Sequence, residues 1–208
     1  MALRIVCISD THARHRSITM PPGDILIHAG DLTRLGEEED VVEFDRWLGT
    51  LLYRHKIVIA GNHDFLFERQ PERARRLITN AAYLQDEGIE IEGLRLWGSP
   101  WQPWFYDWAF NLPRGEALAA KWRLIPARTD ILVTHGPPLG IGDRTVRGEQ
   151  VGCADLLDAV RRLEPRLHVF GHIHEGYGVV RTGRTTFVNA CTCDVAYRPL
   201  NPPCVVDI

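Results

Sequence analysis

The sequence contains no apolar run of the roughly 18 to 20 residues that a membrane-spanning helix needs. Its first apolar stretch is short and leads directly into the polar residues Ser9 to His12, which does not resemble a secretory leader. The five cysteines are an odd number, and they include no C-x-x-C pair of the kind that binds zinc. We therefore expect no membrane partner and no disulfide framework, and reduced thiols in a cytoplasmic protein.

A surplus of basic residues is also missing. Lys and Arg total 24 against 27 Asp and Glu, so the net charge is −3 at pH 7. A phosphate-bearing substrate must then be held locally, by metal ions or a few basic side chains, and long nucleic acid is a disfavoured partner. Gly-rich phosphate loops of the P-loop or dinucleotide type are absent from the sequence. The 208 residues, 45% of them hydrophobic, suffice for one well-buried domain, and we assign residues 1–208 to it.

Short runs rich in Val and Ile alternate with amphipathic stretches along the chain. The short runs predict buried strands at Leu3–Ser9, Ile25–Ala29, Lys56–Ala60, Ile131–Thr134 and Leu167–Phe170. Apolar residues at helical spacing predict helices at Glu37–Arg54, Pro71–Ile78, Gly115–Trp122 and Gln150–Leu163. The alternation is broken by two predicted hairpins and a last strand, at Ile89–Trp101, Tyr177–Ala190 and Pro203–Ile208. The pattern predicts an α/β fold of two packed, mixed sheets flanked by helices, a four-layer α/β/β/α sandwich.

Polar residues that can bind metal follow each of the five predicted strands. The strands lead in turn into Asp10-Thr11-His12, Gly30-Asp31, Gly61-Asn62-His63-Asp64, His135-Gly136 and Gly171-His172-Ile173-His174. In α/β sheets ligands bind at the carboxyl ends of the strands, and residues two apart in an extended segment project to the same face. One such residue alone is more often structural, but their recurrence at five strand ends predicts a functional site.

The residue types of this site select its chemistry. Asp, Asn and His without thiolates suit Mn, Fe or Zn in mixed oxygen and nitrogen coordination. Seven candidate ligands are too many for one ion and fit two ions that share a carboxylate: Asp10, His12, Asp31, Asn62, His135, His172 and His174. Two ions about 3.5 to 4 Å apart clamp the attacking and leaving oxygens of an in-line displacement. The sequence therefore predicts a phosphoesterase with two divalent transition-metal ions, with Mn²⁺ as the first expectation and Fe or Zn as alternatives.

The five-part pattern D-x-H, G-D, G-N-H-[DE], H and G-H-x-H runs in order from Asp10 to His174. It resembles the calcineurin-like metallophosphoesterase superfamily. The longer strings THGPPLG and FGHIHEGYG, with the tail around Asn189 and Tyr197, resemble its MPPED-type branch, whose members are similar to class III cyclic-nucleotide phosphodiesterases. The resemblance covers essentially the whole chain and implies hydrolysis of a small phosphate ester or diester, such as a cyclic nucleotide.

The resemblance also implies a role for each site residue. The first ion would be bound by Asp10, His12 and His174, and the second by Asn62, His135 and His172. The Asp31 carboxylate would bridge both ions. His63 would be the general acid near the leaving oxygen, and Asp64 would orient it by hydrogen bonding. Some members of the branch that lack one metal-binding histidine are feeble catalysts, but this chain has both His172 and His174, so we expect a competent enzyme.

Other readings of the same residues stay open at this point. A nuclease, a phosphomonoesterase or a protein phosphatase would use the same metals, whereas a non-catalytic scaffold on this fold usually has ligands replaced. Arg14 and Arg16 either meet a phosphate or belong to an exposed loop. Asp143 either contacts a sugar hydroxyl or caps a turn.

Two further groups have an ordinary structural explanation. Trp97, Trp101, Trp104 and Trp108 could stack on a base or sugar, but we favour packing over the sheet edge, since aromatic side chains mostly bury area. Cys191 and Cys193 could bind metal, but we favour small residues that alternate along a strand.

Overall fold

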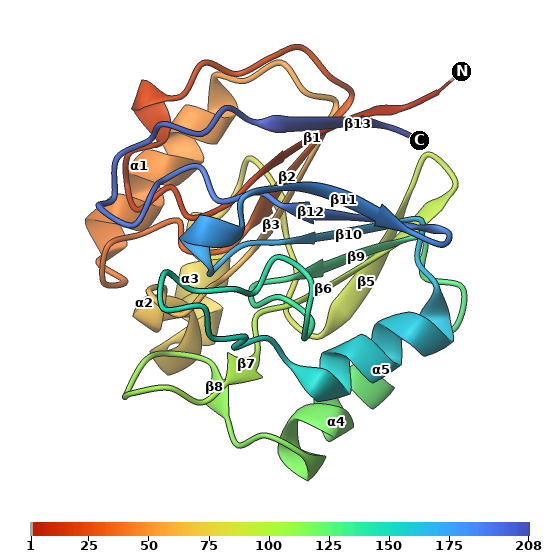
Figure 1. Cartoon of the computed structure of the whole chain (residues 1–208). Helices are drawn as coiled ribbons and strands as arrows, with labels where there is room; N and C mark the ends of the chain where they lie inside the picture. The colour runs from red at the N-terminus through yellow and green to blue at the C-terminus, as the bar shows by residue number, and fades with distance from the viewer. Residues whose placement is uncertain (1) are drawn as a thin grey trace.

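The computed structural model describes residues 2–208, and two β-sheets packed face to face form its centre (Figure 1). The first sheet has the strand order β13-β1-β2-β3-β4. Its strands are β1 (Arg4–Ile8), β2 (Ile25–Ala29), β3 (His55–Ile59), β4 (Ala82–Tyr83) and β13 (Cys204–Asp207). Strands β1 to β4 are parallel, and β13 is antiparallel to β1.

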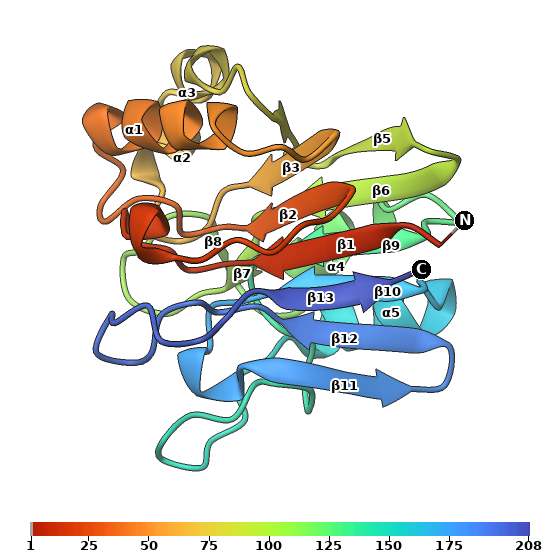
Figure 2. The same cartoon turned by 90° about the horizontal axis from the view of Figure 1, so that it is seen from above.

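The second sheet has the order β11-β12-β10-β9-β6-β5. Its strands are β5 (Glu87–Ile91), β6 (Leu94–Ser99), β9 (Ile131–Thr134), β10 (Leu167–Phe170), β11 (Gly178–Thr182) and β12 (Thr185–Asn189). The four inner strands are parallel, and both outer strands are antiparallel to their neighbours. Figure 2 shows this mixed arrangement, with β1, β2, β3 and β12 pointing one way and β5, β11 and β13 the other.

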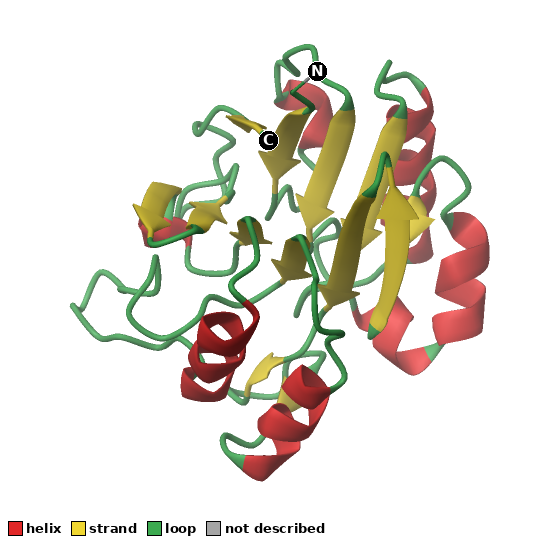
Figure 3. Ribbon diagram, turned by 90° about the vertical axis from the view of Figure 1, so that its right-hand side faces the viewer, coloured by secondary structure: helices red, strands yellow, loops and turns green. Residues whose placement is uncertain are grey.

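Helices cover the outer face of each sheet (Figure 3). The first sheet packs against α1 (Glu38–Gly49), α2 (Phe65–Arg69) and α3 (Pro71–Leu77), and the second against α4 (Glu116–Arg123) and α5 (Ala154–Leu163). The predicted four-layer α/β/β/α fold is thus confirmed. No helix within residues 2–208 is long and apolar enough to span a membrane.

Alternation along the strands builds the layers. In β1, Ile5 and Cys7 face the second sheet, whereas Val6 and Ile8 face the helices. All four side chains are fully buried. A strand buried on both faces has no polar face, which is why these strands are continuous apolar runs. Each fully buried aliphatic side chain stabilises the fold by about 1.5 to 3 kcal/mol.

The predicted element bounds need correction at two helices. Helix α1 ends at Gly49 rather than Arg54, and Leu52 beyond it is 99% exposed. Helix α5 begins at Ala154 rather than Gln150 because the Cys153 side chain caps it, accepting from the backbone N–H of Leu156 at 3.3 Å. The sequence reading also missed α2, β4 and the short pair β7 (Gln102–Pro103) and β8 (Asn111–Leu112).

Candidate metal centre

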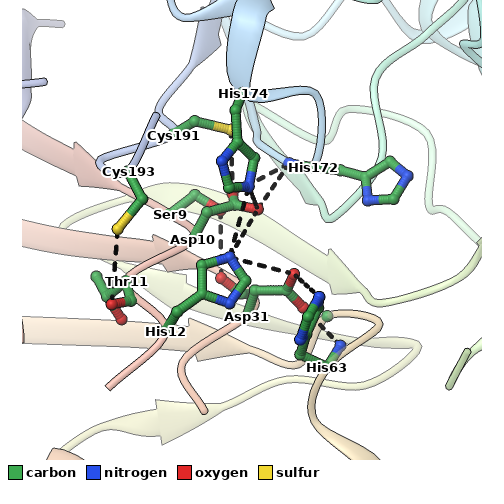
Figure 4. Close-up of polar contacts among 12 residues, drawn as sticks. Ser9, Asp10, Thr11, His12, Asp31, His63, His172, His174, Cys191 and Cys193 are labelled. Carbon is green, nitrogen blue, oxygen red and sulfur yellow. Dashed lines mark hydrogen bonds and ion pairs between the residues drawn. The ribbon is translucent and has the colours of Figure 1, made fainter. Parts of the chain in front are cut away.

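The predicted ligands follow strands of both sheets. Asp10, Asp31 and Asn62 come after β1, β2 and β3 of the first sheet, and His135 and His172 come after β9 and β10 of the second. These strands are parallel within each sheet, so their carboxyl ends lie at one edge. Side chains from both sheets converge there (Figure 4).

The backbone leaves the strands through left-handed conformations at four of these residues. The φ angle is +53° at Asp10, +42° at His12, +56° at Asp31 and +69° at His172. A non-glycine residue in this region costs of order 1 kcal/mol or more and persists only where the surroundings enforce it. One such restraint is the His12 N–H, which donates to the carbonyl oxygen of Asp31 at 3.0 Å. The turned backbone directs the side chains toward one another rather than along the strands.

Asp10, His12 and His174 form the first group of donors. Nε2 of His174 lies 3.3 Å from Asp10 Oδ1 and 3.5 Å from Nε2 of His12, and His12 Nε2 lies 4.0 Å from the same carboxylate oxygen. Asp10 is fully buried, and His12 is 3% exposed. Three potential ligand atoms on buried or nearly buried side chains therefore surround one small volume.

Asn62, His135 and His172 form the second group. The Asn62 Oδ1 lies 2.8 Å from Nε2 of His135 and 2.8 Å from Nδ1 of His172. His135 is fully buried and Asn62 is 2% exposed. The amide oxygen and two imidazole nitrogens thus point at one another from three different strand ends, as the resemblance implied.

Asp31 lies between the two groups. Its Oδ1 is 3.4 Å from His135 Nε2, and its Oδ2 is 3.8 Å from His12 Nε2. Each carboxylate oxygen therefore faces one group, which is the placement that a bridging ligand requires. Burial raises the pKa of Asp31, but the charges of His135 and His63 outweigh it and hold the pKa well below its usual range.

The second ring nitrogens of two of the four histidines have the partners that metal-binding imidazoles have, whereas Nδ1 of His12 is buried without a partner. Nδ1 of His135 donates to the carbonyl oxygen of Ala29 at 2.9 Å, and Nδ1 of His174 donates to that of Asp194 at 2.8 Å. Metal-binding histidines almost always make such a bond, which leaves the other nitrogen facing the ion. Burial lowers the pKa of both rings, yet Asp31 beside His135 and Asp10 beside His174 raise it to about 9. The positions attract positive charge, which divalent cations would supply.

His63 stands beside this cluster, at the solvent side. Its Nδ1 donates to the carbonyl oxygen of Arg34 at 2.6 Å, and its Nε2 lies 3.9 Å from Asp31 Oδ2. The ring lies edge-on to His12, with the ring centroids 4.6 Å apart, and faces Trp108 with centroids 4.2 Å apart at 30°. The ring is fixed in orientation and keeps Nε2 toward the centre, as a proton donor must.

The predicted role of Asp64 is wrong. Its carboxylate accepts from the backbone N–H groups of Gly61, Leu32 and Thr33, at 2.8, 3.2 and 2.9 Å, and from the Thr33 hydroxyl at 2.7 Å. The His63 ring is bonded to Arg34 instead. Burial and the charge of Asp31 raise the pKa of Asp64 to about 6. Asp64 therefore fixes the loop that carries Asn62 and His63 rather than the imidazole itself.

Sequence reasoning missed two contributors to the site. Tyr197 packs edge-on against His12, with centroids 4.7 Å apart, and has φ of +57°. Cys191 lies with Sγ 3.2 Å from Asp10 Oδ2. Cys191 and Cys193 are fully buried and follow β12 rather than alternating within it. The signals in the sequence were the resemblance of the tail around Tyr197 and the position of Cys191 after a strand that ends at the same edge.

The tryptophans do not behave as one group. Trp97 is buried between the second sheet and α4, as the packing interpretation predicts. Trp104 is 60% exposed. Trp108 stacks on His63 and lines the site. One of these tryptophans thus belongs to the site, whereas the packing interpretation holds for Trp97.

Two cavities open beside the donors and meet at His63 and Tyr197. The larger, of about 580 Å³, is lined by His12, Arg14, Arg16 and Arg34 among others, and we call it the arginine cavity. The smaller, of about 220 Å³, is lined by Asp31, Asn62, Phe105, Trp108, His172 and Glu175 among others, and we call it the aromatic cavity.

The structure places the two loop arginines and Asp143 in different surroundings. Arg14 and Arg16 line the arginine cavity beside His12, so they lie where a substrate could reach them. Asp143 instead accepts from the backbone N–H groups of Gly140 at 2.8 Å and Gly152 at 3.1 Å, and it is 2% exposed. Asp143 therefore caps its loop, the structural alternative.

Comparison with a solved structure agrees with this architecture. Protein TT1561 of Thermus thermophilus superposes with a TM-score of 0.60 at 14% identity, over 91% of this chain and 89% of that one. At this identity the likeness shows a shared fold.

Sequence comparison identifies the family. Human metallophosphoesterase domain-containing protein 1 is 53% identical over 230 residues, which cover 99% of this chain and 71% of the human protein. A Caenorhabditis elegans UPF0046 protein is 43% identical over 237 residues, which cover 99% of this chain and 60% of that protein. Residues 3–176 match the calcineurin-like phosphoesterase family. The chain therefore belongs to this family of metal-dependent phosphoesterases, in the MPPED-type branch that its motifs predicted.

Proposed function

We propose that this protein is a phosphodiesterase that hydrolyses small phosphodiesters with two bound divalent transition-metal ions, Mn²⁺ first among them. One observation carries the proposal: Asp31 directs one oxygen toward each group of donors, and His63 holds Nε2 3.9 Å from the same carboxylate. When bound, such an ion pair activates water and offsets the charge of the phosphoryl oxygens.

The chain's own residues would do three things in this reaction. Asp31 and the two donor groups would hold the two ions at the junction of the sheets, where the ions would bind the phosphate. His63 would donate a proton from Nε2 to the leaving oxygen, since its Nδ1 proton is occupied by the Arg34 carbonyl. Trp108 covers the other side of the His63 ring and limits its rotation.

The two cavities favour a diester over a monoester. A monoester has one organic group, whereas a diester has two, and both the arginine cavity and the aromatic cavity border His63. A cyclic nucleotide is a small diester whose two ester oxygens belong to one ribose, and it is our first candidate substrate. Because the five cysteines are buried and unpaired, a reducing compartment such as the cytoplasm suits the protein.

Hydrolysis of bis-p-nitrophenyl phosphate and p-nitrophenyl phosphate, each with Mn²⁺ and with a chelator, tests the proposal. We expect metal-dependent cleavage with the diester preferred. A preference for the monoester would make the protein a phosphomonoesterase. Cleavage of neither with any divalent metal, in a protein without bound metal, would support a scaffold.

The role of His63 has its own test. His63→Ala should keep its metal ions and slow cleavage by about 10²- to 10⁴-fold for esters with poor leaving groups, and by much less for p-nitrophenyl esters. His55→Ala is the matched control, since His55 is a half-buried histidine bonded to Glu92 at 3.2 Å and lines neither cavity. Equal slowing for good and poor leaving groups would remove His63 from the acid role.

A further inference from the structure

The two cavities beside the donor cluster differ in charge. The arginine cavity is lined by Arg14, Arg16 and Arg34, with Asp40 and Glu43 as its acids. The aromatic cavity has Phe105 and Trp108 on its walls, and the acid Glu175 besides the Asp31 of the cluster. A phosphodiester seated at the centre would thus meet two unlike surroundings on its two sides.

One arginine of the larger cavity is left without an internal partner. Arg16 pairs with Glu43 at 2.9 Å, and Arg34 makes a two-pronged contact with Asp40 at 2.8 and 3.0 Å. Within residues 2–208, the Arg14 guanidinium has neither an acidic partner nor a hydrogen bond. Arg14 is therefore the uncompensated positive charge of this cavity.

The backbone of Arg14 is fixed although its side chain is free. Its N–H donates to the carbonyl oxygen of Thr11 at 2.7 Å, and the N–H of the preceding Ala13 donates to Leu32 at 3.0 Å. Arg14 follows His12 by two residues in this loop. The exposed Arg14 side chain therefore lines the cavity beside the buried candidate ligand His12.

Tyr197 and His63 form the boundary between the two cavities, since both residues line each of them. Their ring centroids are 6.1 Å apart, and Tyr197 also lies 5.7 Å from the His174 ring. The loop of Tyr197 is fixed by Asp194, which accepts from the backbone N–H groups of Ala196 and Arg198 at 2.9 Å each. The loop that carries Tyr197 therefore holds this boundary in place, between the two positions that the arms of a bound diester would take.

We propose that the arginine cavity is a subsite for an ester arm that carries its own negative charge, with Arg14 as the residue that recognises it. The preferred substrate is then an asymmetric phosphodiester, with a carboxylate or phosphate on one arm and an aromatic or apolar group on the other. This inference rests on the proposed phosphodiesterase function and adds to it an acyclic substrate class, distinct from cyclic nucleotides, whose two ester oxygens share one ribose.

A pair of synthetic diesters that differ by one charge tests the subsite. The two probes are 4-carboxyphenyl 4-nitrophenyl phosphate and its neutral analogue, 4-carbamoylphenyl 4-nitrophenyl phosphate. Loss of each diester is followed by chromatography on the Mn²⁺-loaded protein, so that cleavage of either ester bond counts. We expect kcat/KM to be higher for the carboxylate by about two- to fivefold, the value of one exposed ion pair, and the preference to shrink as salt is raised.

Arg14→Gln should abolish that preference, so that kcat/KM becomes equal for the two probes. The matched control is Arg76→Gln, which removes an equally exposed arginine on α3 that lines neither cavity. An unchanged ratio in Arg14→Gln, or an equal loss in Arg76→Gln, would overturn the subsite and leave the phosphodiesterase function standing. Cleavage of neither probe by the wild-type protein would instead overturn the proposed function and the subsite with it.

Discussion

Replacing Gly171 by alanine should damage the metal centre without altering any ligand. A Cβ built on Gly171 would lie 2.0 Å from Asp10 Oδ2 and 2.2 Å from the Ser9 hydroxyl oxygen, whereas ordinary contacts begin near 3.4 Å. Asp10 cannot yield easily, because its carboxylate accepts from the His172 N–H at 3.0 Å and contacts Cys191 Sγ at 3.2 Å. The added methyl group must therefore displace Asp10 by more than 1 Å or push the two loops apart.

The size of the effect follows from this overlap. Overpacking of one methyl group costs about 1 to 3 kcal/mol of stability, which for a chain of this length lowers the melting temperature by roughly 2 to 12 °C. Altering a residue that merely supports a metal ligand weakens binding by about 10- to 100-fold. Since the clash in Gly171→Ala is with the ligand itself, Mn²⁺ affinity should fall by at least about 10-fold.

Calorimetric titration with Mn²⁺ measures this loss, and circular dichroism checks that the variant is folded. Gly136→Ala is the control, because Gly136 directly follows His135 but its Cβ would meet only Gln102 Cβ, at 3.4 Å. That variant should bind Mn²⁺ nearly as the wild type does. If Gly171→Ala binds Mn²⁺ with wild-type affinity, the packing of Gly171 against Asp10 is not what places that carboxylate.

Three other outcomes are expected. Asp31→Asn should lose activity and weaken binding of both ions, since it removes the charge between the two donor groups; two tightly bound ions by elemental analysis would contradict the bridging role. Removing the metal with a chelator should lower the melting temperature by roughly 5 to 10 °C relative to protein in Mn²⁺ at 100 times its Kd. The reason is that an ion at this concentration stabilises the native state by about 2.7 kcal/mol. An unchanged melting temperature would refute binding to the native state. Burial lowers the pKa of His168 from 6.5 to about 3. Below pH 6.5 the unfolded chain therefore binds a proton at this residue that the native state does not bind. As the pH falls further, to about 3, this difference lowers the free energy of unfolding by about 1.4 kcal/mol per pH unit. His168→Gln should reduce the slope by about that amount in urea titrations between pH 4 and 6 with chelator present, since burial also lowers the pKa of His15 and His28. The same slope in both proteins would rule out a contribution from His168.

The fold was predictable because its strands are buried on both faces. Runs such as Ile25–Ala29 and Ile131–Thr134 are fully buried and apolar except for His28 and Thr134, and their predicted bounds are the observed ones. Their covering helices have a clear apolar face, but the ends of α1 and α5 depend on local contacts. The cap of α5 comes from a cysteine side chain, and cysteine is not a residue that signals a helix start. The short strands β7 and β8 have two residues each, too few to show any periodicity.

The donors of the candidate site were predictable for a related reason. Each lies at or just beyond a strand end, and parallel strands bring their carboxyl ends to one edge. The partners of those donors were not predictable, because they come from loops distant in sequence. Asp64 shows the limit: its neighbour in sequence is His63, but its carboxylate binds the backbone of Leu32 and Thr33 instead. Adjacency in sequence says little about a side chain at a turn, where φ and ψ change at every residue.

Each donor group takes residues from both sheets. Asp10 and His12 follow β1 of the first sheet and meet His174 from beyond β10 of the second, while Asn62 follows β3 and meets His135 and His172. The apolar layer between the sheets joins them along their length, but at this edge the facing groups are carboxylates, an amide and imidazoles. Such buried polar groups stabilise an interface only when they are fully paired. The cations that would pair them would also be the chemical centre of the proposed reaction, so the edge that hydrophobic packing leaves incomplete is the edge at which we propose that the substrate binds.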